Sequence, residues 1–334
     1  MATLIIRRAG ILTTVQDLGR PGWGRFGVPA SGAMDALAAR TANALVGNDP
    51  AAAVLELTGP GAALTVSLPD QRDDPPRLVA VAGADLDATI TDGAGHARAL
   101  PPGRAQLVSD GDTLTFPRRR AGARAILGVA GGLAVPRTFA SAATDVANQL
   151  GGWQGRPLRA GDALPIGNEP ASARRVTADD RLPAMLAAAY ADPFVLRFIA
   201  LPLALPWALP LATTKAASFI EATYRVTPRA NRVGFRLQRE GGPLIADSAA
   251  GTLLSEPIAP GTLQLPPDGQ PILLMADRQT VGGYPVLGHV IAADLPKAAQ
   301  LWPGDRVRFA AVTLAEARAE LRRQEEAFAF WSSP

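Results

Sequence analysis

Short apolar runs, separated by turn residues, dominate the chain from residue 53 to residue 167. A run recurs about every ten residues, which is typical of a β-barrel or β-sandwich and not of alternating strands and helices. We predict strands at Val54–Leu57, Ala63–Ser67, Leu78–Ala82, Ala88–Thr91, Ala105–Val108, Thr113–Phe116 and Arg124–Val129. The pattern therefore predicts a mainly β fold with a few helices.

Two segments instead carry apolar residues at helical spacing. From Ala33 to Val46 the apolar positions fall on one face, and Gly47 stands where a left-handed C-cap belongs. Residues 313–330 form a second amphipathic pattern. Thr313 and Glu316 at its start have the spacing of a capping box. We predict a helix at each place.

The turn and proline content divides the chain into domains. We expect an N-terminal domain over 1–180, a C-terminal domain over 181–312 and the terminal helix over 313–330. The linker is predicted at 168–193, with a short alanine-rich helix at 183–191. Gly-Asp pairs followed by a strand-like run recur in both halves, at Gly111-Asp112, Gly161-Asp162 and Gly304-Asp305. These repeated pairs are a weak sign of two related halves, since Gly-Asp turns are common.

The most apolar segment, Phe194–Ala212, is not expected to cross a membrane. Prolines at 202, 206 and 210 would each remove a helical hydrogen bond where no water replaces it. We predict a buried strand over 194–200, followed by an extended loop. No membrane association is expected.

Composition excludes several classes of site. The chain has 334 residues and no cysteine, which rules out disulfides, thiolate zinc sites and cysteine nucleophiles. Net charge is only +3 and the arginines are scattered, so nucleic-acid binding is not expected. The one basic run, Arg118–Arg120, is interpreted as a solvated loop. These features, with no signal-peptide pattern, fit a cytoplasmic protein.

Familiar catalytic motifs are also missing. The two histidines, His96 and His289, are far apart and in no metal-ligand spacing, so no metal site is predicted. Neither lies in a Ser-His-Asp context, and no P-loop sequence occurs. A dinucleotide fold is disfavoured as well. The polar residues that remain suit a small amide or carboxylate ligand, which arginine binds bidentately and side-chain amides orient.

Two glycine-rich stretches carry most of these polar residues. Thr14–Asp35 contains five glycines among charged and amide side chains, and such a loop lets backbone approach a ligand closely. Gln264–Pro285 brings four polar residues, Asp277 to Thr280, to the end of a predicted strand and then two glycines. A polar hairpin with a glycine bulge explains the second stretch equally well. For Asp35, at the start of the predicted helix, simple N-capping and competition with a bound anion are equally weighted.

Both stretches resemble one known family. Three segments closely resemble the opening of the allophanate hydrolase subunit 2 family, also called the biotin-dependent carboxyltransferase-like family. They are Thr14-Val-Gln-Asp-Leu-Gly-Arg-Pro-Gly, Gly27–Asp35 and Ala42–Asn48. Gly261–Pro266 and Asp277–Pro285 resemble its C-terminal hallmark. The resemblance runs from about residue 8 to residue 312. The family includes the C-type subunit of 5-oxoprolinase and the carboxyltransferase region of urea carboxylase.

The resemblance implies a fold, partners and a reaction. Two cyclophilin-like β-barrel domains are expected. The chain would act only in complex with the family's subunit 1, which is similar to the B-type subunit of 5-oxoprolinase, and with a separate A-type subunit. Together they would open 5-oxoproline to glutamate at the expense of ATP, which binds through the assembled complex. Because no biotin-attachment sequence occurs, any biotin would arrive on another protein.

Several flanking motifs depart from the family pattern and leave the substrate open. Ile126 replaces a tyrosine, Phe139–Thr144 lacks an arginine, Asn231 replaces an aspartate and Pro257 a glycine. Two alternatives therefore stay open. One is a carboxyltransferase subunit for urea or a related amide, with carboxybiotin supplied in trans. The other is a non-catalytic partner that sequesters a regulatory subunit 1.

The resemblance and the residue types together suggest roles. Arg278 and Arg232 would hold a carboxylate, while Gln16, Gln264 and Gln279 would orient the amide. The candidate acids and bases are Asp17, Asp35, Asp277 and Tyr284. Further substrate-binding candidates are Arg20, Ser255, Glu256, Gln270 and Thr280.

Overall fold

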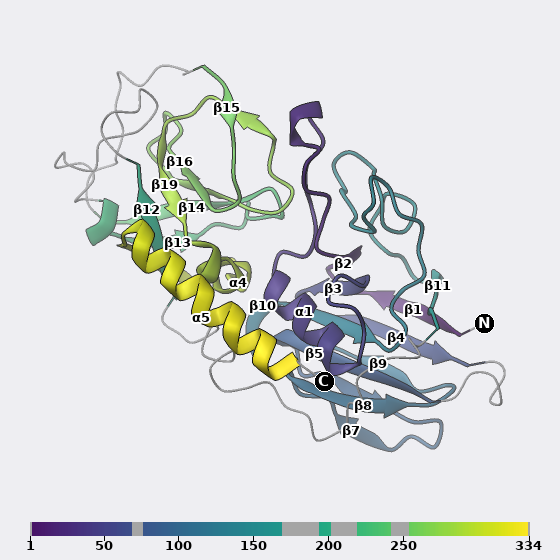
Figure 1. Ribbon diagram of the computed structural model, residues 1–334. Helices are drawn as coiled ribbons and strands as arrows, with labels where there is room; N and C mark the ends of the chain where they lie inside the picture. Colours follow the sequence, from purple (N-terminus) through teal and green to yellow (C-terminus); the bar gives the residue numbers. More distant parts are fainter. Residues whose placement is uncertain (1, 69–75, 169–193, 202–218, 242–253, 333–334) are drawn as a thin grey trace. The chain divides into compact units, whose positions relative to one another are not determined.

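The computed structural model describes residues 2–68, 76–168, 194–201, 219–241 and 254–332 (Figure 1). The chain divides into two compact units. Unit 1 comprises Met1–Arg20, Ser31–Ala184 and Ser332–Pro334; unit 2 comprises Pro21–Ala30 and Met185–Trp331. The predicted boundary at 180/181, the helix at 183–191 and the proline-rich loop after residue 201 lie outside the described residues.

Unit 1 is built from two antiparallel sheets. The six-stranded sheet has the order β11-β1-β4-β9-β6-β7, and the five-stranded sheet has the order β2-β3-β10-β5-β8. The strands are β1 Thr3–Ala9, β2 Leu12–Gln16, β3 Val54–Thr58, β4 Ala62–Ser67, β5 Arg77–Asp85, β6 Thr89–Thr91, β7 Ala97–Ala99, β8 Arg104–Val108, β9 Thr113–Thr115, β10 Ala121–Val129 and β11 Ala163–Pro165. All seven strands predicted in this region are confirmed.

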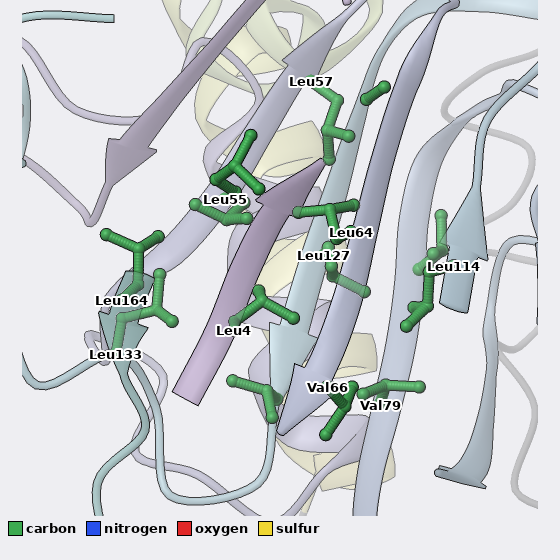
Figure 2. Packing of buried hydrophobic residues seen from close by; sticks show 14 of the residues in the cluster. Leu4, Leu55, Leu57, Leu64, Val66, Val79, Leu114, Leu127, Leu133 and Leu164 are labelled. Atoms are coloured by element: carbon green, nitrogen blue, oxygen red, sulfur yellow. The ribbon is translucent and has the colours of Figure 1, made fainter. Parts of the chain in front are cut away.

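The core of unit 1 follows from the alternation of side chains along these strands. In β1, Leu4 and Ile6 are buried while their neighbours are more exposed, as expected for a strand with one face on the core. Figure 2 shows Leu4 packed with leucines and valines from strands of both sheets, such as Leu55, Leu64 and Leu127. The burial of this apolar surface is the main force that holds the two sheets together.

Helix α1 (Ala36–Leu45) contacts β10 and β5 of the same unit. At Gly128 an added Cβ would lie 2.9 Å from the carbonyl oxygen of Ala42, so glycine is what lets the helix approach the strand this closely. Gly47 follows the helix with φ of 74°, which confirms the predicted left-handed residue. A short 3-10 helix, η1, covers Gly24–Phe26.

Unit 2 contains a closed barrel with the order β12-β19-β16-β17-β14-β13-β20. Its strands are β12 Phe194–Ala200, β13 Thr223–Val226, β14 Gly234–Glu240, β16 Thr262–Gln264, β17 Ile272–Leu274, β19 Val286–Val290 and β20 Arg306–Ala311. The barrel closes through parallel pairing of β12 with β20, and the other ladders are antiparallel. Phe198, Phe219, Tyr224 and Phe309 fill it with mutual ring contacts.

Smaller elements complete unit 2. A two-stranded ribbon pairs β15 (Glu256–Pro257) with β18 (Val281–Gly282). The 3-10 helix η3 (Ala292–Asp294) leads into α4 (Leu295–Ala299). Helix α5 (Leu314–Ser332) begins with the predicted capping box: the amide of Glu316 donates to Thr313 Oγ1, and the amide of Thr313 donates to Glu316 Oε2.

The Gly-Asp pairs singled out in the sequence form the same turn in both units. In each, the aspartate carboxylate accepts a hydrogen bond from the backbone amide three residues earlier, namely Ser109, Arg159 or Trp302. The glycine and aspartate of each turn also exchange backbone hydrogen bonds with one residue of another segment, namely Val66, Ile6 or Val226. The three Gly-Asp pairs thus form turns with the same hydrogen bonds.

The predicted fold class needs one correction. The fold is mainly β, as expected, but only unit 2 contains a closed barrel. In the described part of unit 1 the strands belong to two separate open sheets, because no strand there pairs with both. Thr14–Gln16, the beginning of the stretch interpreted as a glycine-rich loop, belongs to strand β2. None of the helices in the described ranges is long and apolar enough to cross a membrane.

Candidate functional site

The candidate residues divide between the two units. Gln16, Asp17, Arg20 and Asp35 belong to unit 1. All the others, from Arg232 to Tyr284, belong to unit 2. Each group is therefore described within its own unit. Across the described ranges no cluster of histidine, aspartate and glutamate has the geometry of a metal site.

Asp17 is bound on both carboxylate oxygens by its own chain. Oδ1 accepts hydrogen bonds from the amide of Gly19 and from Ser141 Oγ, both at 2.7 Å. Oδ2 accepts from the amide of Ala142 at 2.6 Å. With 3% of its surface exposed, the side chain ties the end of β2 to the segment around residue 141. This arrangement is that of a structural anchor, and proton transfer by Asp17 would require these bonds to break.

Arg20 lies in the interior of unit 1, with 1% of its surface exposed. Its guanidinium donates to the carbonyl oxygen of Ala143. Gly151, with φ of 68°, leaves the space that the guanidinium occupies, because a Cβ there would be 2.6 Å from Arg20 Nη2. Arg20 is thus held by the loop on which Asp17 is also anchored.

The N-terminus of α1 is occupied by carboxylates of the chain. Asp35 is the N-cap, and its Oδ1 accepts from the amide of Ala38 at 2.8 Å. Glu56 on β3 accepts from the amide of Met34 at 2.7 Å. Of the two alternatives for Asp35, the structure shows N-capping, which satisfies an amide that an external anion would otherwise bind.

Each unit ends a strand in Thr-x-Gln with a buried glutamine. Gln16 donates from Nε2 to Thr14 Oγ1 and to the carbonyl oxygen of Thr144, but its Oε1 has no hydrogen-bond partner among the described residues. Gln264 accepts at Oε1 from Gln279 at 3.5 Å, and its Nε2 has no hydrogen-bond partner among the described residues. A buried polar atom without a partner costs about 1–3 kcal/mol, so both amides are suited to gain from a ligand.

Arg232 and Asp277 form a buried bidentate ion pair. Arg232 Nε lies 2.8 Å from Asp277 Oδ2, and Nη2 lies 3.0 Å from Oδ1. Both side chains are 5% exposed. The sequence suggested a carboxylate ligand for one and acid–base chemistry for the other. The structure instead commits them to each other.

Arg278, in contrast, has no carboxylate partner within the described ranges. Its Nε donates to the carbonyl oxygen of Ile258 at 3.0 Å, and Nη1 donates to that of Met275 at 3.4 Å. Burial lowers the pKa of Arg278, because the charged form loses hydration. A half-buried cation held only by carbonyl oxygens gains more from an anionic ligand than an arginine already paired.

A pocket of about 430 Å³, counted out to the solvent at its mouth, lies in unit 2 beside these residues. It is lined by residues of the β15–β18 ribbon and of β16 and β19: Glu256, Pro257, Ile258, Thr262, Gly282, Tyr284, Val286 and His289, together with Leu201 and Leu254. Glu256 and Tyr284 are predicted site residues. Two lining residues contact further candidates: the carbonyl oxygen of Ile258 accepts from Arg278, and Gly282 faces Gln264.

Three predicted residues stand apart from this pocket. Gln270 accepts a hydrogen bond from the amide of Arg239 and lines a different pocket, with Arg229 and Asp268. Ser255 is exposed on the chain just before β15. Thr280 contributes its carbonyl oxygen, which accepts from the amide of Ile258. Its role is therefore to hold the ribbon.

Sequence reasoning missed His289. It was considered only as a metal ligand or triad member, and it lies on β19 in direct register with Thr262 of β16. Thr262 Oγ1 and His289 Nδ1 are 3.0 Å apart. The only local signal was a polar residue within the apolar run of β19, which is more often a satisfied core residue. The register between β16 and β19, which the sequence does not reveal, brings Thr262 and His289 together.

Gly282 is expected to be intolerant of a side chain. In Gly282→Ala the new Cβ would lie 2.7 Å from Gln264 Nε2 and would also contact Ile258 Cδ1. We expect the free energy of unfolding to fall by about 1–3 kcal/mol as ribbon and barrel separate. Thermal unfolding measures this loss. Gly93→Ala is the control, since a Cβ there meets nothing within 4 Å, and equal effects in the two variants would contradict the close approach.

Comparison with known proteins agrees with this architecture. The protein-family model described as carboxyltransferase domain, subdomain A and B, matches residues 26–311 of this chain. The C-type subunit of 5-oxoprolinase from Escherichia coli is 35% identical over 325 residues, which cover 97% of this chain and 96% of that protein.

Two solved structures extend the comparison. The protein TTHA0988 is 32% identical with a TM-score of 0.74, and the match covers 93% of this chain and 56% of that chain. The K. lactis urea amidolyase has a TM-score of 0.80 at 24% identity over 98% of this chain and 20% of that chain, so it supports the fold alone. The chain therefore belongs to the carboxyltransferase domain family with subdomains A and B.

Proposed function

We propose that this chain is the C-type subunit of an ATP-dependent 5-oxoprolinase, the enzyme that opens 5-oxoproline to glutamate. The observation that carries the proposal is its 35% identity to the C-type subunit of the Escherichia coli 5-oxoprolinase over nearly the whole of both chains. In contrast, the match to the K. lactis urea amidolyase covers 20% of that chain. A relative that matches this chain over its full length is the better guide to what this chain does as a separate subunit.

The pocket in unit 2, together with the polar residues next to its lining, supports a substrate of this class. 5-Oxoproline is a small cyclic amide that carries a carboxylate. Arg278 offers a half-buried guanidinium without a carboxylate partner among the described residues, and the side chain is able to bind a carboxylate bidentately. Gln264 and Gln279 offer amides, and Tyr284 lines the pocket as a proton donor. We assign the substrate carboxylate to Arg278 and not to Arg232, which Asp277 already holds.

The proposed enzyme is a hetero-oligomer. This chain would work with a B-type and an A-type subunit, and ATP would bind through the assembled complex, since the sequence contains no P-loop. As the reaction consumes ATP, we place the complex in the cytoplasm. We also propose that both domains are related to cyclophilin-like barrels. The Gly-Asp turns repeated in the two units support a common origin for them.

The second candidate is a carboxyltransferase that acts on urea or a similar amide. The matched family model, a carboxyltransferase domain, is the observation that favours it. Biotin would then be carried by a separate protein, because this chain has no attachment sequence. The same pocket would bind an amide without a carboxylate, and Arg278 would not be required.

The deciding experiment is reconstitution of this chain with its B-type and A-type subunits, followed by measurement of glutamate released from 5-oxoproline. We expect glutamate only when all three subunits and ATP are present. Arg278→Lys should lose most of the activity, because the bidentate fork is gone, whereas Arg236→Lys, at a different pocket of unit 2, should not. A stable complex that releases no glutamate would overturn the proposal, and urea with carboxybiotin would be assayed next.

A further inference from the structure

The hydrogen bonds around Thr262 determine which nitrogen of His289 carries a proton. Thr262 Oγ1 lies 2.8 Å from the carbonyl oxygen of Ala259 and 3.0 Å from His289 Nδ1. A hydroxyl has one proton, and a carbonyl oxygen is only an acceptor, so the hydroxyl donates to Ala259. It must therefore accept from Nδ1–H. In the neutral ring this leaves Nε2 with a free lone pair.

The surroundings keep this imidazole neutral. His289 is half-buried, and burial lowers its pKa because the charged form loses hydration. Its neighbour in register on β12 is the apolar Ile199, and on β16 it is Thr262. The titratable groups that share its pocket are Glu256 from the ribbon and Tyr284 from the segment before β19. No ion pair of His289 exists in the part of the chain that the structure describes.

Nε2 is available to a ligand. The ring lines the pocket with Val286 and Tyr284, and its one side-chain hydrogen bond among the described residues is that of Nδ1 to Thr262. A neutral nitrogen acceptor in a partly apolar pocket selects ligands that offer an N–H group. Amides and lactams with an N–H fit this requirement, and N-alkylated analogues do not.

We propose that His289 accepts a hydrogen bond from the N–H of the small amide bound in this pocket, and that Thr262 is the positioning residue that sets its tautomer. The choice of 5-oxoproline as the ligand rests on the proposed function. The tautomer and the preference for an N–H do not. An acceptor on the amide N–H draws electron density toward the carbonyl oxygen, which makes that oxygen a better nucleophile for an activating group.

The first test is nitrogen NMR of the chain labelled with ¹⁵N-histidine. The chain has only two histidines, so the variant His96→Gln leaves the signals of His289 alone. We expect a protonated Nδ1 and an unprotonated Nε2 at neutral pH, and a mixture of tautomers in Thr262→Val. A protonated Nε2 in the unmodified chain would overturn the inference.

The second test adds ligands to the labelled chain within the reconstituted complex. We expect 5-oxoproline to shift the Nε2 resonance and its N-methyl analogue to leave it unchanged. If the complex hydrolyses 5-oxoproline but Nε2 never responds, the inference fails and the proposed function stands. If the complex is inactive but urea or another N–H amide shifts Nε2, the proposed function fails and the inference stands.

The third test is kinetic. In the active complex His289→Gln should raise KM about tenfold, the effect of one lost hydrogen bond, with a smaller change in kcat. His96→Gln is the matched control, because that histidine is exposed and its side chain contacts Asp92 of its own turn. Binding should weaken as the pH falls through the lowered pKa of His289, when Nε2 gains a proton and no longer accepts. An unchanged KM in His289→Gln would contradict the assignment.

Discussion

Replacement of Asp277 by alanine is expected to lower the free energy of unfolding by about 3–5 kcal/mol. The substitution leaves the Arg232 guanidinium buried without the carboxylate that binds it at 2.8 and 3.0 Å. A charge that is removed from water and loses its counter-charge is far more costly than a surface ion pair. Denaturant unfolding, followed for the transition of unit 2, measures the loss.

Two further variants test the reason for this loss. Asp268→Ala removes an exposed aspartate of unit 2 whose carboxylate accepts from the amide of Gln270 in its own turn, and it should change stability little. The double variant Arg232→Met with Asp277→Leu should recover most of the stability, because no unpaired charge remains in the interior. If Asp277→Ala unfolds like the unmodified chain yet abolishes 5-oxoproline hydrolysis, Asp277 is a catalytic acid or base and the structural assignment is wrong.

The second large effect is expected at Asp17, where alanine should cost about 3 kcal/mol of stability. Two buried donors, the amide of Ala142 and the hydroxyl of Ser141, and the part-buried amide of Gly19 would lose their acceptor. Asp17→Asn should be nearly as harmful, because its NH₂ group would face donors and not acceptors. Thermal unfolding of unit 1 reports the change.

Asp49 provides a matched control for Asp17. It makes the same kind of turn, with Oδ1 accepting from the amide two residues later at 2.7 Å, but it is exposed to solvent. Asp49→Ala should therefore cost well under about 1 kcal/mol, since water replaces the lost bond. Equal losses at the two positions would show that the buried network around Ser141 contributes nothing.

Local patterns in the sequence were sufficient to predict seven strands of unit 1, strand β12 and helices α1 and α5. Helix α1 with its Asp35 N-cap and Gly47, and the capping box of α5, depend on contacts between residues close in sequence, and the strands of unit 1 were predicted from the spacing of apolar runs and turn residues. The Gly-Asp turns also close within a few residues. Such features are visible in sequence because periodicity, turn chemistry and capping need no distant partner.

The tertiary structure alone decided how the polar residues are used. Ser141 reaches Asp17 across 124 positions, Arg232 reaches Asp277 across 45, and His289 reaches Thr262 across 27. Which side chains meet depends on sheet register and on barrel closure, and these are set by packing of the whole unit. Barrel closure likewise depends on which strands pair. Two barrels were expected, and among the described residues only unit 2 closes one. The sequence by itself thus determined the elements and the stretches that carry polar chemistry, whereas the fold determined that Asp277 is paired, that Arg278 faces no carboxylate in the described chain and that His289 lines the pocket.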